Sequence, residues 1–326
     1  MNRLQRRKVA IALAVAALGL RLPVAEGRAF PARPIRLLVG YAPGAHSDAI
    51  ARLIGRALEA ELQVPVVVEN RSGANGTIAV AAVVGSPADG HTLGLVGSGN
   101  LVLAPLVDAT MRYDAQRDVV ALARISRTPM VLAAHADLPA QGLDQLLAHA
   151  RRHPGKLTFA STGNIAQLAI ESLKASAGID VVVVPYRGTA PALLDVVAGR
   201  VDLVLADVAS VAPQARSGTL RLIAGTDPSR SRTFPDLPTM AEQGVSDAVW
   251  EAWQGIVAPA GTPVEIVGGL RAALLRARAS PEFREGLDRL GFEPIDEPAD
   301  AFATIVRQET ERLRRLVHRL GASAGR

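Results

Sequence analysis

The amino-acid sequence predicts an α/β fold, and three observations support that prediction. Short apolar runs alternate along the 326 residues with longer segments whose apolar side chains recur at helical spacing, as parallel α/β folds require. The turns from a predicted strand to the next predicted helix are short and rich in Gly, Ser or Pro. No internal repeat or low-complexity linker interrupts the alternation. Hydrophobic residues make up 49% of the chain, which excludes intrinsic disorder and supplies core for one large or two ordinary domains.

The first predicted elements are strands joined by amphipathic helices. Pro34–Tyr41 is a mostly apolar run of strand length, and Ser47–Leu62 places its apolar residues on one helical face. Three consecutive valines indicate a second strand at Pro65–Glu69. We expect a short helix at Thr77–Val84 and a strand at Thr92–Val96.

The middle of the chain continues the same alternation. Its predicted strands are short and rich in Val, Leu and Ile, and its predicted helices are longer and amphipathic. The strands are expected at Val119–Ile125, Met130–Ala134, Leu157–Ala160, Val181–Pro185, Asp202–Ala206 and Leu220–Ala224, and the helices at Leu143–Arg152, Gln167–Ala177 and Ala190–Ala198.

The C-terminal part is predicted to be mainly helical. An extended segment at Trp250–Ala258 is followed only by helices, expected at Val264–Arg278, Pro281–Leu290 and Pro298–Leu320. The last of these has charged residues on one face and apolar residues on the other, typical of a helix packed on a core. Trp250 and Trp253 lie three residues apart, a spacing that suits packing in a core or hinge, or the wall of a ligand cleft.

Composition excludes several classes of protein. The chain has no cysteine, so disulfides, Cys-ligated metals and a Cys nucleophile are excluded. No His-Glu-x-x-His motif joins any of its six histidines. The net charge of +5 comes from residues 1–29, where six Lys or Arg face one Glu, so the remainder is neutral, with 30 basic and 30 acidic residues. A nucleic-acid-binding protein would carry its basic excess on the folded body, and this chain does not.

Residues 1–29 resemble a secretory signal peptide. A basic start at Met1–Lys8 precedes an apolar run at Val9–Leu20, which is shorter than the roughly 20 residues needed to span a bilayer. Small residues follow, and we expect cleavage after Ala29 or Ala25. Arg6-Arg7 also permits the twin-arginine route, although the general pathway fits better. The alternatives are an uncleaved anchor and a cytosolic amphipathic arm. The mature chain is therefore expected to be periplasmic.

Four turns after predicted strands have the chemistry of an anion site. Backbone N–H groups and helix dipoles point outward at such turns, and Gly, Ser, Thr and Asn let a ligand approach and add hydrogen bonds. Any one of these turns alone could be an ordinary turn or a capped helix start. Because all four have the same kinds of residue, together they predict a cleft that binds an anion. Their candidate ligand-binding residues are Tyr41, Pro43, Gly44, Ala45, His46, Ser47 and Asp48; Ser98, Gly99 and Asn100, after Gly97; Ser161, Thr162, Gly163 and Asn164; and Tyr186, Arg187 and Gly188.

Catalytic and cofactor motifs are missing. The sequence has no Gly-x-x-x-x-Gly-Lys-Ser/Thr loop, no Gly-x-Gly-x-x-Gly after a strand and no Gly-x-Ser-x-Gly elbow. His46 adjoins Ser47 and Asp48, but neighbouring side chains at a helix start splay apart and cannot form a relay. We therefore expect no cofactor, no metal and no enzymatic activity, and we expect His46 to be a polar histidine at the pocket rim.

Ordered sequence strings then resemble one family, the Bug-type solute receptors related to tripartite tricarboxylate transporters. The resemblance extends from Pro31 to about Gln308, and its strings are individually weak but specific as an ordered set. They are Pro34-Ile-Arg-Leu-Leu-Val39; Pro43-Gly44 with Asp48; Val68-Glu-Asn-Arg-Ser-Gly73; Ala88-Asp-Gly-His-Thr-Leu93; Tyr113-Asp114 with Asp118; Pro154-Gly-Lys-Leu-Thr158; Val184-Pro-Tyr-Arg-Gly188; Pro235-Asp-Leu-Pro-Thr239; and Ala258-Pro-Ala-Gly-Thr-Pro263.

This resemblance implies a two-domain periplasmic-binding-protein (type II) fold. Each domain would be a sheet flanked by helices, with two crossing hinge strands between the domains. Domain 1 would combine residues 30–124 with 250–326, and domain 2 would be residues 125–249. Small carboxylates would bind in the interdomain cleft, held by loop amides, hydroxyls and water. The mature chain would be a monomer that presents its closed form to membrane partners.

The resemblance also shows where this chain departs from its family. In the first loop Ala45 replaces a second Gly and His46 follows, which would narrow the approach to the ligand's carboxylate; a protonated His46 would attract the anion weakly. The loop at 161–171 is two residues shorter than usual and lacks a Gly, a hydroxyl and a His. Ile165 and Ala166 there imply a more apolar wall, which favours an aromatic or apolar monocarboxylate over a tricarboxylate. Asp207 is left open between receiving a ligand amine and bracing the hinge.

Three functions remain in view at this point. The first is a solute-binding protein that delivers a small carboxylate to membrane transporter subunits. The second is a receptor with the same pocket that signals to a membrane sensor kinase. The third is an enzyme on the same scaffold, which would need a general base facing a nucleophile across the cleft.

Overall fold

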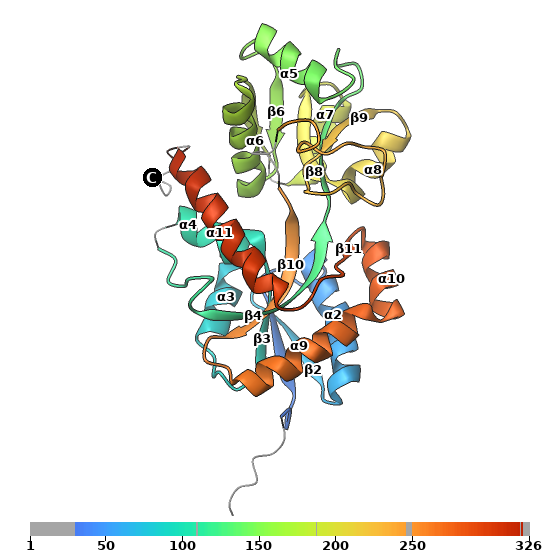
Figure 1. Cartoon of the computed structure of the whole chain (residues 1–326). Coiled ribbons are helices and arrows are strands. Elements are labelled where there is room, and N and C mark those ends of the chain that lie inside the picture. The colour runs from blue at the N-terminus through green and yellow to red at the C-terminus, as the bar shows by residue number, and fades with distance from the viewer. Residues whose placement is uncertain (1–29, 109, 187, 246–249, 320, 322–326) are drawn as a thin grey trace, which may run out of the picture.

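The structure consists of two lobes, each built on its own β-sheet (Figure 1). It is a computed structural model, and it describes residues 30–108, 110–186, 188–245, 250–319 and 321. The expected signal peptide lies outside the described residues. Among the described residues, none of the helices has the length and apolar character needed to cross a membrane.

Lobe 1 contains a six-stranded sheet in the order β11-β4-β10-β3-β1-β2. Strand β1 pairs in parallel with β2 and β3. Strand β10 pairs antiparallel with β3 and β4, and β11 pairs antiparallel with β4. Its strands are β1 (Ile35–Val39), β2 (Val66–Asn70), β3 (Thr92–Gly97), β4 (Val119–Thr128), β10 (Ala252–Pro259) and β11 (Glu293–Pro294), and its helices are α2 (His46–Leu62), η1 (Ala74–Gly76), α3 (Thr77–Val84), η2 (Ser98–Leu103), α4 (Ala104–Val107), α9 (Val264–Ala279), α10 (Pro281–Leu290) and α11 (Ala301–Arg319).

Lobe 2 contains a five-stranded sheet in the order β7-β6-β8-β5-β9. Strand β6 is parallel to β7 and β8, whereas β5 is antiparallel to β8 and β9. Its elements are β5 (Met130–His135), α5 (Leu143–Arg152), β6 (Thr158–Ser161), α6 (Asn164–Ala177), β7 (Val182–Pro185), α7 (Thr189–Val197), β8 (Leu203–Asp207), α8 (Val208–Arg216) and β9 (Leu220–Gly225).

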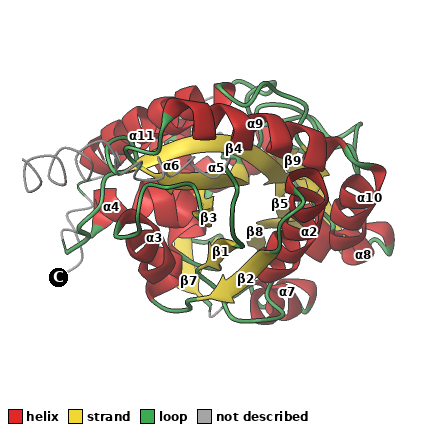
Figure 2. Ribbon diagram, turned by 90° about the horizontal axis from the view of Figure 1, so that it is seen from below, coloured by secondary structure: helices red, strands yellow, loops and turns green. Residues whose placement is uncertain are grey.

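Each sheet is covered by helices on both faces, as the view from below shows for lobe 1 (Figure 2). One face of the lobe 1 sheet packs on α2, α9 and α10, with Ile54, Leu270 and Phe283 fully buried there. The opposite face packs on α3, η2 and α11, and this core continues into lobe 2 through Trp250 and Trp253. Because helices cover both faces of each sheet, the apolar strands are buried on both faces and consist of continuous apolar runs, which can be recognised in the sequence.

Two strands carry the chain between the lobes, which confirms the hinge strands expected from the resemblance. Strand β4 of lobe 1 continues through Pro129 into β5 of lobe 2, and the chain returns through β10. Strands β4 and β10 pair with each other from Pro259↔Val119 to Ala252↔Thr128. Figure 1 shows both rising from the lower sheet toward the upper lobe.

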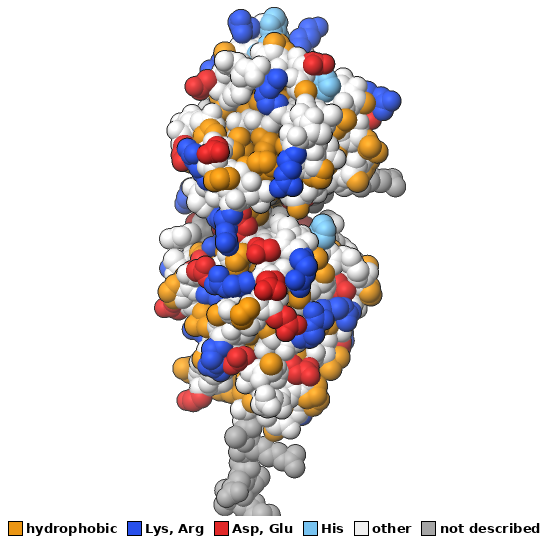
Figure 3. All heavy atoms as spheres, turned by 90° about the vertical axis from the view of Figure 1, so that its right-hand side faces the viewer, with side chains coloured by type: hydrophobic (Ala, Val, Ile, Leu, Met, Phe, Trp, Pro, Cys, Tyr) orange, Lys and Arg blue, Asp and Glu red, His pale blue; other side chains and the backbone are white. Residues whose placement is uncertain are grey.

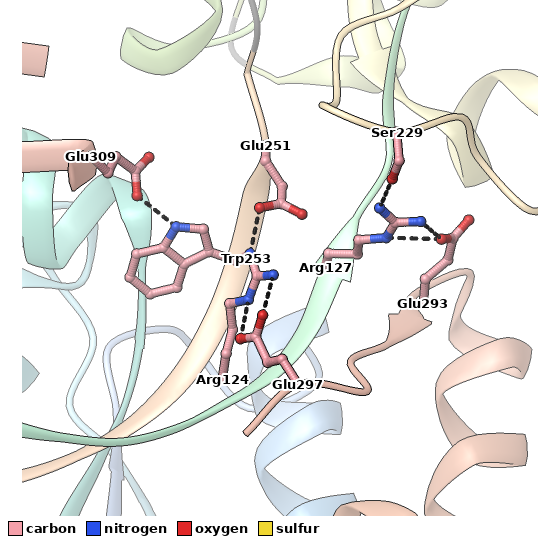
Figure 4. Close-up of polar contacts among 8 residues, drawn as sticks. All are labelled: Arg124, Arg127, Ser229, Glu251, Trp253, Glu293, Glu297 and Glu309. Carbon is pink, nitrogen blue, oxygen red and sulfur yellow. Dashed lines mark hydrogen bonds and ion pairs between the residues drawn. The ribbon is translucent and has the colours of Figure 1, made fainter. Parts of the chain in front are cut away.

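Charged side chains tie the hinge together on the side of α10 and α11 (Figure 4). The guanidinium of Arg124 donates to Glu297 at 2.8 and 2.9 Å and also pairs with Glu251. Arg127, near the end of β4, donates to Glu293 at 2.5 and 2.9 Å and to Ser229 of lobe 2 at 2.6 Å. We call this set of side chains, with Trp253 and Glu309, the hinge network.

Two carboxyls with raised pKa values, those of the buried Asp227 and the half-buried Glu309, lie at the hinge. Asp227 is 3% exposed and accepts a hydrogen bond from the Met130 N–H at 2.8 Å, and burial raises its pKa to about 8. Glu309 accepts a 2.6 Å hydrogen bond from the indole of Trp253, and burial raises its pKa to about 7. Both Trp250 and Trp253 are buried, and Trp253 packs edge-on against Phe302. The tryptophans therefore serve the hinge core rather than the cleft.

The structure corrects the sequence predictions at several places. Both sheets are mixed rather than parallel, because the hinge strands and their neighbours pair antiparallel. The C-terminal part is not purely helical after β10, since β11 adds a two-residue strand beside β4. Helices η1, η2, α4 and α8 were not predicted. The other expected strands and helices are present, with ends that differ by a few residues.

Candidate functional site

A cavity of about 570 Å³ lies between the lobes, beside the hinge strands. The surface narrows to a waist at the level of this gap (Figure 3). Both lobes and both hinge strands line the cavity. The lining residues are Tyr41, Ala74, Asn75, Thr77, Gly99, Leu103, Ala104, Val107, Asp108 and Met111 from lobe 1; Met130, Thr162, Gly163, Ile165, Ala166, Thr189, Ala206 and Asp207 from lobe 2; and Thr128 and Ala252 from the hinge strands.

Helices of lobe 2 begin at this cavity. Helices α6 and α7 start after Gly163 and Gly188, whose φ angles of 151° and 109° favour glycine, and neither helix start has a side-chain cap. Their first N–H groups and positive dipole ends are therefore available to an anion. Helix α8 differs, because Asp207 caps it by accepting hydrogen bonds from the N–H and hydroxyl of Ser210, both at 2.8 Å.

The first predicted loop is held in shape by Asp48. This buried carboxylate accepts hydrogen bonds from the Gly44 N–H at 3.0 Å, from Arg52 at 2.9 Å and from Asn70 at 2.9 Å. The hydrogen bonds, that from Arg52 above all, lower the Asp48 pKa to about 2. Asp48 therefore positions the loop, and it does not line the cavity.

Part of the first loop faces a second, smaller cavity of about 340 Å³. Ala45, His46 and Ser47 line it, together with Gln254, whose amide donates to the Ser47 hydroxyl at 3.3 Å. The ring of His46 lies edge-on to Phe292 at 5.6 Å between centroids. Tyr41, Thr128 and Asp207 line both cavities, so the two are adjacent parts of one gap between the lobes. Pro43 and Gly44 line neither.

The second predicted loop forms a π-helical turn, η2. Asn100 is buried and its side chain accepts from the Gly97 N–H at 2.8 Å, and Ser98 is also buried. Only Gly99 of this loop lines the cavity. A Cβ added to Gly99 would lie 3.1 Å from Cδ1 of Ile165, so the two lobes meet at this point.

The third and fourth loops contribute fewer residues than the sequence predicted. Thr162 and Gly163 line the cavity, whereas Ser161 is buried beneath them. The Tyr186 hydroxyl donates to Asp195 at 2.7 Å within lobe 2, and this bond raises its pKa. Arg187 and the side chain of Asn164 lie outside the described residues.

Several lining residues were missed by the sequence predictions. Asn75 and Thr77 follow Gly73 in a Gly-rich turn after β2, and the criterion used for the other turns would have found them. Leu103, Val107 and Met111 carry no such signal, because packing of η2 and α4 brings them to the cavity. Asp108 was missed because nothing in the sequence around it distinguishes it from an acidic residue of an ordinary surface loop.

The charged side chains in the described lining of the larger cavity are the carboxylates of Asp108 and Asp207. Among its described lining residues there is no Lys, Arg or His. His46 faces the smaller cavity, and its ring contact is with Phe292 rather than with a nucleophile. In the described part of the chain, no group of three or more His, Asp or Glu is placed to hold a metal ion.

Comparisons with known proteins agree with the two-lobed fold. The family model described as "Tripartite tricarboxylate transporter family receptor" matches residues 50–322. Protein BugT of Bordetella pertussis is 33% identical over 96% of both chains. Among solved structures, a TctC solute-binding protein from Polaromonas without ligand has a TM-score of 0.82 at 26% identity, covering 89% of this chain and 99% of that one. Rpa4515 of R. palustris, solved with adipate, has a TM-score of 0.73 at 32% identity, covering 90% and 98%.

Proposed function

The chain belongs to the tripartite tricarboxylate transporter receptor family, and on that premise we propose that it captures a small carboxylate between its lobes and delivers it to membrane transporter subunits. Family membership makes it a periplasmic solute-binding protein of the Bug type. The identity of the solute, the cleft as its site and the transporter as its destination are the proposed parts.

The observation that carries the proposal is the cavity between the lobes, where helices α6 and α7 begin without side-chain caps. Two uncapped helix starts offer backbone N–H groups to one carboxylate. The adipate bound to Rpa4515 shows that a structural neighbour takes a small carboxylate.

The proposed capture step is closure of the lobes about the hinge strands. Residues 30–124 with 250–326 would move as one domain and residues 125–249 as the other. We propose that residues 1–29 direct export and are removed, and that the mature chain acts as a monomer. Mass spectrometry of the protein isolated from a periplasmic fraction measures the cleavage point.

A thermal-shift screen of the exported protein against small carboxylates, amino acids and neutral solutes tests the function. A ligand at 100 times its Kd should stabilise the folded protein by about 2.7 kcal/mol. Gly99→Val should abolish the shift, because its side chain would enter the gap that Ile165 closes. Gly142→Val is the matched control, since a Cβ there meets no atom within 4 Å.

The screen contradicts the proposal if only neutral solutes stabilise the protein, or if Gly99→Val responds like Gly142→Val. Recovery of unchanged ligand after long incubation is the accompanying check on the expectation that the protein is not an enzyme. Loss of solute uptake in a deletion strain, restored by the wild-type gene, tests delivery to a transporter.

A further inference from the structure

The cleft has apolar walls on both sides. Leu103, Val107 and Met111 face it from lobe 1, and Ile165 and Ala166 face it from lobe 2. Met130, Ala206 and Ala252 extend this surface along the hinge. Burial of an apolar ligand body against these side chains would stabilise the complex.

Ile165 brings the lobe 2 wall into contact with lobe 1. Its Cδ1 would lie 3.1 Å from a Cβ at Gly99, so a glycine is what leaves room for the isoleucine. The contact places a branched apolar side chain over the ligand space beside the start of α6. A ligand whose carboxylate meets that helix start therefore has its body next to Ile165.

Among the described residues that line the larger cavity, the charged side chains are those of Asp108 and Asp207. Asp108 accepts hydrogen bonds from the N–H and hydroxyl of Thr110 at 2.8 and 2.6 Å, and these bonds lower its pKa. Asp207 accepts from Ser210 as the cap of α8. The hydrogen bonds from Thr110 thus favour the ionised form of Asp108, and the described residues of the lining include no Lys, Arg or His.

The described lining favours a ligand with one negative charge over a ligand with two. One carboxylate has the starts of α6 and α7 available to it. A second carboxylate on the same ligand would enter a partly enclosed space that already contains the Asp108 and Asp207 charges, where like charges repel.

We propose that the cleft selects a monocarboxylate with an apolar body, and that Asp108 discriminates against the dicarboxylate of the same length. This inference rests on the proposed function and deepens it by naming the ligand class. Asp108 would contribute to selectivity by repelling a second carboxylate of the ligand. Ile165 and the Leu103–Met111 wall would contribute by covering the apolar body of the ligand.

Calorimetric titration with hexanoate and adipate tests the proposal, because the two differ only in the second carboxylate. We expect wild-type protein to bind hexanoate at least about tenfold more tightly than adipate. Rpa4515, which was solved with adipate, serves as the positive control for the adipate titration.

Variants assign the discrimination to residues. Asp108→Asn should tighten adipate binding severalfold and leave hexanoate nearly unchanged, so the ratio narrows. Asp236→Asn removes an equal charge from an exposed loop position that lines neither cavity, and it should preserve the ratio. Ile165→Thr should weaken hexanoate more than adipate. Unliganded melting temperatures report whether each variant is folded.

Adipate binding as tight as hexanoate in the wild type would overturn the inference while leaving the proposed function intact. An unchanged ratio in Asp108→Asn would overturn the role of that residue. If neither compound nor any other carboxylate of the screen binds to folded protein, the proposed function fails and the inference fails with it.

Discussion

The two sides of the hinge differ in how they use charge. On the cleft side, the described lining of the larger cavity contains two carboxylates and no Lys, Arg or His, and helices α6 and α7 begin there without side-chain caps. On the opposite side, Arg124 and Arg127 are paired with Glu251, Glu297 and Glu293. The comparison shows that the ion pairs of the hinge network hold the hinge, whereas the proposed site would bind its ligand through helix dipoles and apolar surface.

The side chains of these ion pairs also connect the two lobes through hydrogen bonds. Glu293 belongs to β11 of lobe 1, and it accepts hydrogen bonds from the Ser231 hydroxyl at 3.1 Å and the Arg232 N–H at 2.8 Å in lobe 2. Arg127 bridges Glu293 and Ser229 in the same place. The lobes are thus fastened on one side of the hinge strands, so closure over a ligand can occur on the other side.

Arg124→Met should have the largest effect, and it acts on the fastened side. The guanidinium is 9% exposed and pairs with two carboxylates, so its removal leaves Glu251 and Glu297 without their cation. Breaking a buried pair in this way costs about 3–5 kcal/mol, and we expect a loss near the lower end because both glutamates retain some contact with solvent. Urea unfolding followed by tryptophan fluorescence measures it.

Two further variants make that prediction specific. Arg314→Met breaks an exposed pair with Glu311 and should cost about 1 kcal/mol or less. Adding Glu297→Gln to Arg124→Met should recover part of the lost stability, since one unpaired charge is removed. Equal losses of unfolding free energy in Arg124→Met and Arg314→Met would contradict the special role assigned to the ion pairs of the hinge network.

Asp227→Asn should change how stability depends on pH. Burial raises the folded pKa of Asp227 from 3.8 to about 8, with Glu251 and Glu293 raising it further and Arg127 and the Met130 N–H opposing. The folded protein therefore holds a proton that the unfolded chain releases, and this contribution to stability is lost as pH rises from about 4 to about 8. Asparagine should reduce the loss by a few kcal/mol. Thermal unfolding from pH 5 to pH 8.5 measures it.

Asp48, at the foot of the cleft-side loop, titrates in the opposite direction. Its hydrogen bonds lower the folded pKa to about 2 from 3.8, so its contribution to stability is present above pH 4 and is lost as pH falls toward 2. Asp236→Asn, at an exposed position, is the control for the predictions on Asp227 and on Asp48.

For Asp227, a pH dependence of stability in Asp227→Asn equal to that of the wild type would show that the Asp227 carboxyl is not protonated in the folded protein.

The predictability of the fold follows from burial. Strands covered on both faces become continuous apolar runs, and for that reason β1, β3, β6 and β8 were visible in the sequence. Helix α8 was missed because Pro213 interrupts its nine residues, and η2 because a π-helical turn lacks the 3.6-residue period. The antiparallel pairing of β4 with β10 depends on residues far apart in the chain, and local patterns do not encode it.

The site was predictable to the extent that it consists of turns after strands. Thr162, Gly163 and Gly99 were found by that chemistry, and they line the cleft. Asn100 and Tyr186 satisfied the same pattern, but their polar atoms are used within their own lobes. The hinge network was not predicted, because Arg124 meets Glu251 and Glu297 across 127 and 173 residues of sequence.

His46→Ala should have the smallest effect, and it examines the cleft side itself. His46 is exposed and lies at the smaller cavity beside Phe292 rather than in the larger one. Removal of this ring leaves the uncapped starts of α6 and α7 in place, so benzoate affinity at pH 7 should fall by about twofold or less. His153→Ala, at the far end of α5, is the control and should leave benzoate affinity unchanged. A loss of more than about tenfold in His46→Ala alone would show that the smaller cavity takes part in ligand binding. A loss within the expected range would sharpen the contrast, because an anion would then bind on the cleft side without a contribution from this side chain.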